Sequence, residues 1–214
     1  MISRPVAAVD LDALYAKPLT SLLIARMVER DLMPEESLRI PRLPDAARLP
    51  ALGRALKGVA YDEAEAMANE LTEEHKGRVF PYVMGMLLEL KSRGYFLLAI
   101  SGAPRFLVDG FAYEAGFDKS YGSFFATGAS ERFTGAVEDE EVITNRGAVL
   151  QRAVRKEKLV MKGSVGLAAS ASFIPVLEMV ENPLVFNPDH ELRAHAEKRG
   201  WKVVLEEDGT VYKL

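Results

Sequence analysis

The chain has 214 residues, enough for one α/β domain with a small insert and too few for two full domains. Apolar residues make up 49% of it, so a sizeable core can form, and the net charge of −4 gives no reason to expect a nucleic-acid partner. The absence of cysteine excludes disulfides and thiolate metal sites, and no apolar run is long enough to cross a bilayer. We therefore expect a cytoplasmic protein without a membrane span.

The first half of the chain predicts one strand followed by helices. A short apolar run over Pro5–Val9 is typical of a buried strand, and it leads into Asp10-Leu11-Asp12. Apolar residues at helical spacing and prolines that punctuate the stretch predict four helices, at Leu19–Arg30, Ala46–Lys57, Tyr61–Glu74 and Arg78–Ser92. This stretch is too long for a simple crossover between strands. It predicts a helical cap, residues 17–91, inserted after the first strand.

The second half alternates between strand and helix signals. Short strands with turns at Gly122, Gly128 and Gly135 are expected over Ser120–Val137. The remaining strands are predicted at Tyr95–Ile100, Ser164–Leu167, Leu184–Phe186 and Val203–Leu205, and the helices at Arg105–Glu114, Asn145–Lys156, Phe173–Val180 and Asp189–Arg199. The pattern predicts an α/β fold, in which residues 1–16 and 92–214 form a Rossmann-like parallel sheet covered by helices on both faces.

Asp10 and Asp12 stand at the predicted carboxyl end of the first strand, where ligands bind in open parallel sheets. Residues two apart on a strand point the same way, so the two carboxylates are expected side by side, with one pKa raised. Such a pair suits chemistry in which one acid attacks and the other transfers a proton. The alternative is that Asp12 caps a loop and Asp10 is solvated.

A second polar site follows the strand that ends at Ile100. Ser101-Gly102-Ala103-Pro104 lies where this strand hands over to a helix. A hydroxyl, a glycine and free backbone N–H groups at a helix N-terminus favour anion binding. The signal is informative because it comes after an Asp-x-Asp strand end.

In this order, the motifs resemble the haloacid dehalogenase (HAD) superfamily, and more closely its phosphoserine phosphatase-like branch, which has a helical cap after the first strand. The resemblance rests on Asp10-Leu11-Asp12-Ala13-Leu14, on Ser101, on the Phe133-Thr134-Gly135 turn and on Arg146 opening a helix. It implies that Asp10 is the phosphate-attacking nucleophile and Asp12 the general acid and base. It also implies that Ser101, Gly102 and Arg146 bind the phosphate.

The fourth family motif is altered. Family members carry two acids here, and Ile174-Pro175-Val176-Leu177 sets the register, which puts Ala169 and Phe173 at the two acidic positions. The resemblance implies a magnesium ion held by Asp10, the Asp12 carbonyl and a fourth-motif carboxylate. Magnesium needs near-octahedral oxygen ligation, which Ala169 and Phe173 do not supply. Asp10 and Asp12 are therefore the metal ligands that remain if magnesium still binds, and the protein otherwise works with none.

Three functions stay open from the sequence. The first is a pseudophosphatase, inactive or impaired, that binds a small phosphorylated molecule. The second is a weak magnesium-dependent phosphomonoester hydrolase that forms an aspartyl-phosphate. The third is metal-independent hydrolysis at carbon, as in the dehalogenases. The sequence identifies neither the substrate nor a protein partner, because the predicted cap shows no motif.

Overall fold

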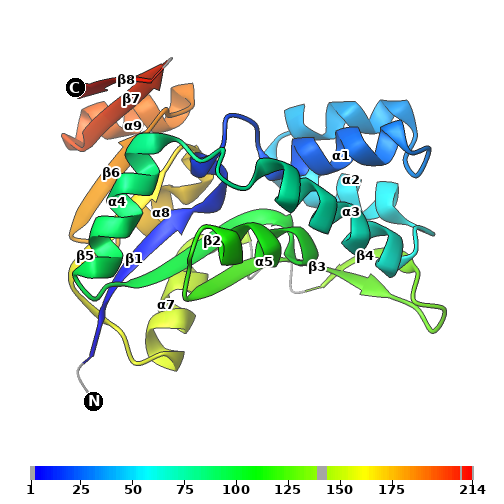
Figure 1. Ribbon diagram of the computed structural model, residues 1–214, viewed down its shortest axis with the longest axis horizontal. Coiled ribbons are helices and arrows are strands. Elements are labelled where there is room, and N and C mark those ends of the chain that lie inside the picture. Colours follow the sequence, from blue (N-terminus) through cyan, green and yellow to red (C-terminus); the bar gives the residue numbers. More distant parts are fainter. Residues whose placement is uncertain (1–2, 139–143, 208, 214) are drawn as a thin grey trace.

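The computed structural model describes residues 3–138, 144–207 and 209–213. Its strands are β1 (Pro5–Asp10), β2 (Phe96–Pro104), β3 (Lys119–Thr127), β4 (Phe133–Glu138), β5 (Val160–Ala168), β6 (Asn182–Phe186), β7 (Lys202–Glu207) and β8 (Thr210–Lys213). They form one sheet in the order β4-β3-β2-β1-β5-β6-β7-β8 (Figure 1). The inner pairs are parallel, and β4 and β8 are antiparallel strands at the two edges. The predicted α/β fold with a parallel sheet is confirmed.

Helices follow most strands in the described parts of the chain. The α-helices are α1 (Leu19–Glu29), α2 (Asp45–Leu56), α3 (Tyr61–His75), α4 (Pro81–Ser92), α5 (Arg105–Glu114), α7 (Arg146–Lys156), α8 (Ile174–Leu177) and α9 (His190–Arg199). Three 3-10 helices complete this set, namely η1 (Leu11–Leu14), η2 (Glu35–Arg42) and η3 (Ala171–Phe173). None of the helices in these described parts is long and apolar enough to cross a membrane.

The central strands bury both faces, and their side chains divide between two hydrophobic clusters. Along β1, Ala7 and Val9 pack with α1, α3, α4 and α5, whereas Val6 and Ala8 pack with α7, α8 and α9. This alternation follows from the two-residue period of a strand. Because helices cover both faces, apolar residues fill both sets of positions. The polar side chains of β1 are therefore confined to its carboxyl end, at Asp10.

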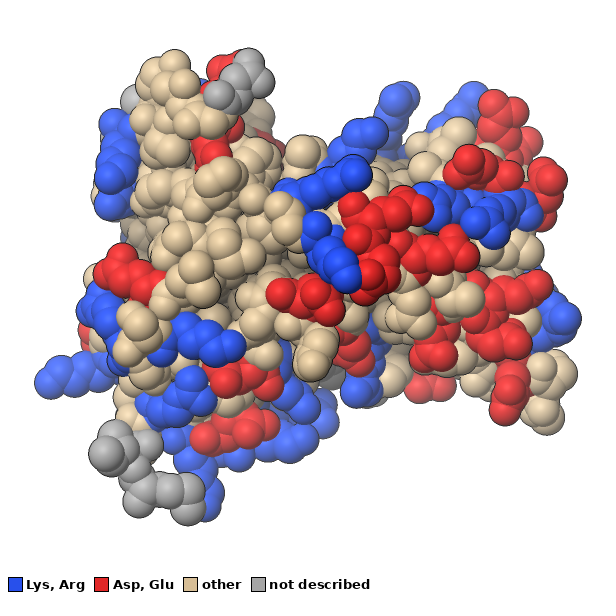
Figure 2. Space-filling model, viewed as in Figure 1, with Lys and Arg blue, Asp and Glu red and all other residues tan. Residues whose placement is uncertain are grey.

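Helices α1, α2 and α3 gather at one end of the molecule, beside the β3–β4 hairpin (Figure 1). Arg26 of α1 forms ion pairs with Glu70 and Glu74 of α3, and side chains of both charges cover this end of the face in Figure 2. The hairpin supports these helices through backbone hydrogen bonds from Gly58 and Tyr61 to residues 133 and 131. The division into a core and a cap of residues 17–91 stays a prediction.

The structure differs from the sequence predictions at several boundaries. The turn expected at Gly122 is wrong, because β3 runs through that residue. A Cβ atom there would lie 2.8 Å from the Cα of Arg105, so the glycine allows β3 to pass the start of α5. Gly135 has a φ of +95° inside β4 and is not a turn either. Strand β8, which the sequence analysis did not predict, pairs with β7.

Helix α2 approaches β4 closely at Gly53. A Cβ atom at this position would lie 2.6 Å from the carbonyl oxygen of Gly135, a distance that requires the backbone to move. We predict that Gly53→Ala lowers the free energy of unfolding by about 1–3 kcal/mol, measured by urea denaturation. Gly85→Ala is the matched control, because Gly85 also lies within a helix and nothing lies within 4 Å of its added Cβ. The control should be neutral or slightly stabilising, and equal losses in both variants would contradict the prediction.

Candidate functional site

A cavity of about 930 Å³ lies between the carboxyl ends of the central strands and the helices of residues 17–91. The sheet side supplies Gly102 and several polar residues, among them Asp10, Asp12, Arg146, Ser172 and Asp189. The other side includes Pro18, Pro41, Arg48, Leu49 and Leu52. The cavity occupies the position where open parallel sheets bind their ligands. It brings together four of the five residues predicted for catalysis and phosphate binding.

Asp10 ends β1 with its side chain facing the cavity, and the residue is only 1% exposed. Burial raises the pKa of its carboxyl to about 7; the Arg146 cation opposes the rise, Asp12 adds to it, and the backbone N–H groups of Ala169 and Asp12 oppose it. The Oδ2 atom has no hydrogen-bond partner within the described structure. Asp10 thus places a buried carboxylate with one unpartnered oxygen at the wall of the cavity.

Asp12 reaches the same cavity by a different route from the one predicted. The strand ends at Asp10, and Asp12 lies in η1, so the two side chains do not share a face through strand alternation. Its Oδ1 accepts the N–H of Leu19 at 2.7 Å, and its Oδ2 accepts the hydroxyl of Ser101 at 2.6 Å. Since Leu19 opens α1, Asp12 accepts an N–H group at the start of that helix, as the capping alternative expected of Asp12. The same carboxylate ties β1 to β2. The other half of the capping alternative, a solvated Asp10, is wrong, because Asp10 is buried.

Ser101 and Gly102 lie side by side in β2 but differ in access. Ser101 is fully buried and does not line the cavity; its hydroxyl donates to Asp12 and accepts the N–H of Ala103 at 3.0 Å. Gly102 lines the cavity, and a Cβ atom there would lie 3.1 Å from Nη2 of Arg146. The missing side chain leaves room for the guanidinium. Phosphate binding by Ser101 and Gly102 stays a prediction.

Arg146 opens α7 as predicted and is only 9% exposed. Its Nη1 donates to the hydroxyl of Ser172, which is hydrogen-bonded to Ser170 at 2.8 Å between their Oγ atoms. The guanidinium also lies over the ring of Phe173, 5.9 Å from its centroid. These contacts hold a positive charge at the wall of the cavity, next to Asp10. A guanidinium so placed can bind phosphate oxygens in a bidentate way.

The residues present do not fit the magnesium site that the family resemblance implies. Ala169 lines the cavity with a methyl group, and Phe173 is fully buried in the core behind Arg146. The oxygens of Asp189 accept the N–H groups of Ala171 and Leu192. Within the described residues, no group of three acidic, histidine or cysteine side chains is arranged to hold a metal. Asp10 and the Asp12 carbonyl alone leave most of magnesium's octahedral shell without protein ligands.

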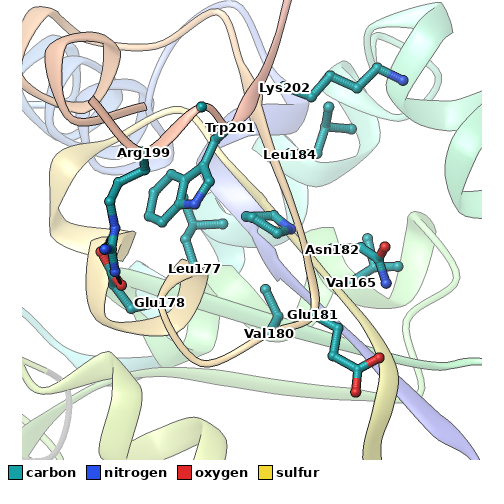
Figure 3. A pocket seen from close by; sticks show the side chains of 12 residues that line it. Val165, Leu177, Glu178, Val180, Glu181, Asn182, Leu184, Arg199, Trp201 and Lys202 are labelled. Atoms are coloured by element: carbon teal, nitrogen blue, oxygen red, sulfur yellow. Dashed lines mark hydrogen bonds and ion pairs between the residues drawn. The ribbon is translucent and has the colours of Figure 1, made fainter. Parts of the chain in front are cut away.

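Glu178, the acid that follows the altered motif in the sequence, faces away from this cavity. It pairs with Arg199 beside a separate hollow at the amino ends of β6 and β7 (Figure 3). Its Oε1 atom also lies 2.7 Å from Nε2 of His195. Its carboxylate is therefore engaged by these two side chains, at the amino ends of the strands and away from the cavity. Glu178 does not replace the acids lost at Ala169 and Phe173.

Sequence reasoning missed several residues of the cavity. Ser170 and Ser172 hold Arg146 in place, yet the sequence shows them only as small residues in a turn. Asn187 lines the wall at the end of β6, with a φ of +42° that asparagine tolerates better than most residues. The sequence Asn187-Pro188-Asp189 was a signal for that turn, because each of its residues is common in turns. Arg48 had no such signal.

A comparison with models of protein families establishes the family of this chain. The model for haloacid dehalogenase-like hydrolases matches residues 9–171, which include Asp10, Asp12, Ser101 and Arg146. The chain belongs to this family. The predicted resemblance is thereby confirmed. No curated protein matches the chain.

Solved structures show the same fold at low sequence identity. A protein of unknown function from Bordetella pertussis Tohama I is 19% identical, with a TM-score of 0.73 over 94% of this chain and 98% of that one. Phosphoserine phosphatase in its apo form is 19% identical, with a TM-score of 0.67 over 89% and 90%. A phospho-aspartyl intermediate analogue of phosphoserine phosphatase is 20% identical, with a TM-score of 0.66 over 90% and 91%. The fold is thus that of the phosphoserine phosphatase-like branch.

The raised pKa of Asp10 predicts a dependence of stability on pH. Between the ordinary pKa of 3.8 and the folded value of about 7, the folded chain binds the Asp10 proton more tightly than the unfolded chain. Its contribution to stability is therefore lost as pH rises across this window. We predict that the unfolding free energy of the wild type, relative to Asp10→Asn, falls between about pH 4 and 7 and is constant above. Urea denaturation at each pH measures the difference, and a flat difference would refute the assignment.

Proposed function

We propose that the chain is a phosphatase-fold protein that binds a small phosphorylated molecule and has lost most or all of its phosphomonoesterase activity. The observation that carries this proposal is Ala169, whose methyl group lines the cavity where the family places a metal-binding carboxylate. Phe173, at the second acidic position, is buried away from the cavity. The two fourth-motif carboxylates are thus missing, while the cavity is retained.

The binding part of the proposal rests on Arg146. Its charge is fixed beside the cavity by Ser172 and Phe173, so little conformational freedom is lost when an anion binds. Gly102 leaves space next to the guanidinium. The phosphate oxygens would accept N–H groups of Arg146 while the ester body extends toward the cap helices. Binding in this pose needs no resident metal.

The loss of hydrolysis follows from charge. For in-line attack, the Asp10 carboxylate must approach a phosphorus atom surrounded by anionic oxygens. Without a divalent cation the repulsion is offset mainly by Arg146, which lies to one side on α7. Asp12 accepts two hydrogen bonds, from the N–H of Leu19 and the hydroxyl of Ser101. One of these hydrogen bonds must break before Asp12 can protonate a leaving oxygen. Removing one electrostatic stabiliser of a transition state costs roughly 10²–10³ in rate.

A weak magnesium-dependent phosphomonoester hydrolase is the second candidate, and one observation favours it. The Oδ2 atom of Asp10 is unpartnered and belongs to a residue that lines the cavity, as a nucleophile requires. Magnesium would then bind only weakly, through Asp10, the Asp12 carbonyl and the substrate. This candidate and the binding protein differ in turnover, which can be measured directly.

We predict that inorganic phosphate binds the wild type in buffer containing EDTA, measured by isothermal titration calorimetry. Arg146→Ala should weaken binding by roughly 10–100-fold, because a charge-assisted hydrogen bond contributes about 1.5–3 kcal/mol. Arg155→Ala is the matched control, since Arg155 is an exposed arginine of the same helix. The proposal is wrong if phosphate does not bind, or if both variants bind it as the wild type does.

Restoring a single carboxylate tests the hydrolytic side. We predict that Ala169→Asp gains magnesium-dependent hydrolysis of 4-nitrophenyl phosphate, at least about tenfold above wild type. The wild type should match Asp10→Asn in the same assay. Phe173→Asp is unsuited to this test, because removing a buried Phe side chain alone costs about 3–5 kcal/mol. Wild-type hydrolysis that requires both magnesium and Asp10 would instead support the second candidate.

A further inference from the structure

The cavity of the candidate site has two chemically different halves. Polar groups crowd the edge of the sheet, around Asp10 and Arg146. The opposite wall is largely apolar, with Pro18, Pro41, Leu49, Leu52 and Phe80 among its residues. Its polar members within residues 17–91 include Thr20, Ser21 and Arg48. The two halves together enclose about 930 Å³, near the upper end of the range of about 300–1,000 Å³ for sites that bury drug-sized ligands. A small amino-acid phosphate would leave much of this space unfilled.

The charges of the lining also restrict the ligand. Among the described residues, the lining acids are Asp10, Asp12 and Asp189, all outside residues 17–91. Asp12 and Asp189 use both of their oxygens to accept protein hydrogen bonds. On the cap side the charged lining residue is a cation, Arg48, whose Nη2 donates to the carbonyl of Leu43 at 2.9 Å. The carboxylates described at this cavity thus lie at the sheet edge, where the phosphate would bind, and the body of the ligand would meet mainly apolar surface on the cap side.

We infer that the ligand is a phosphate monoester with a large, apolar body, such as an aryl or branched alkyl phosphate. This inference rests on the proposed function, because it places the phosphate at Arg146. The body then extends along the wall that Leu49 and Leu52 line, where both leucines are packed in apolar surroundings. Covering that surface and removing the ligand body from water provide the affinity beyond the phosphate contact.

Three probes that share one phosphate group test the inference by calorimetry in EDTA. We expect 2-naphthyl phosphate to bind at least about tenfold more tightly than inorganic phosphate, because burying an aromatic ring contributes more than the 1.4 kcal/mol that corresponds to a tenfold change. O-phosphoserine should bind no more tightly than inorganic phosphate. Leu49→Ala should reduce the preference for 2-naphthyl phosphate several-fold and leave the affinity for inorganic phosphate unchanged. Leu38→Ala is the control, because Leu38 is 44% exposed and does not line the cavity.

The outcomes separate the two claims. If inorganic phosphate binds through Arg146 but 2-naphthyl phosphate gains nothing, or if O-phosphoserine binds more tightly, the apolar-body inference is overturned and the proposed function stands. If none of the three probes binds, the proposed function fails and the inference fails with it. The ranking of probes on the wild type decides the matter even if Leu49→Ala does not fold.

Discussion

A carboxylate buried at the end of a doubly covered strand needs a nearby positive charge, and the local structure is organised around that requirement. Asp10 is almost completely removed from water, and the Arg146 cation lowers its pKa against the effect of burial. Arg146 is in turn held by Ser172 and by the ring of Phe173. The carboxyl end of β1, the start of α7 and the turn after β5 therefore meet around Asp10 and Arg146, with the cavity formed beside these residues.

The same arrangement explains how the site accommodates the loss of family acids. A carboxylate at either altered position would have competed with Asp10 for positive charge. With Ala169 and Phe173 in their place, Arg146 faces Asp10 and Asp12 with fewer neighbouring acids, so the charge at the cavity wall is closer to balance. The aromatic ring of Phe173 contributes in a further way, because it fills the core between the sheet and α7 while supporting the guanidinium. These contacts are the basis of our proposal that the chain keeps a binding pocket and has impaired chemistry.

The helices of residues 17–91 supply most of the apolar lining of the cavity, whereas the sheet edge supplies most of its charged residues. Their inner residues present an apolar wall to the cavity, and ion pairs between Arg26 and α3 join two of them. The β3–β4 hairpin supports these helices through the close approach of Gly53 to Gly135 and through the backbone hydrogen bond from Gly58 to Phe133. In the proposed function, the phosphate therefore binds at the sheet edge, and the helices of residues 17–91 select the body of the ligand. In this proposal, substitutions in α2 change which ligand body is preferred and leave the surroundings of Asp10 and Arg146 unchanged.

Local patterns in the sequence were sufficient for the fold class, for most elements and for the identity of the polar residues at the strand ends. Three of these features depend only on neighbouring residues in the chain, so the sequence predicts them without the tertiary structure. They are the apolar run before Asp10, the Asp189 cap of α9 and the position of Arg146 at the start of α7. Tertiary structure alone decided how these groups are used. Asp12 bonds Ser101, which is 89 residues away, and Gly122 continues a strand because α5 begins against it. Such contacts join segments distant in sequence, and no local propensity encodes them.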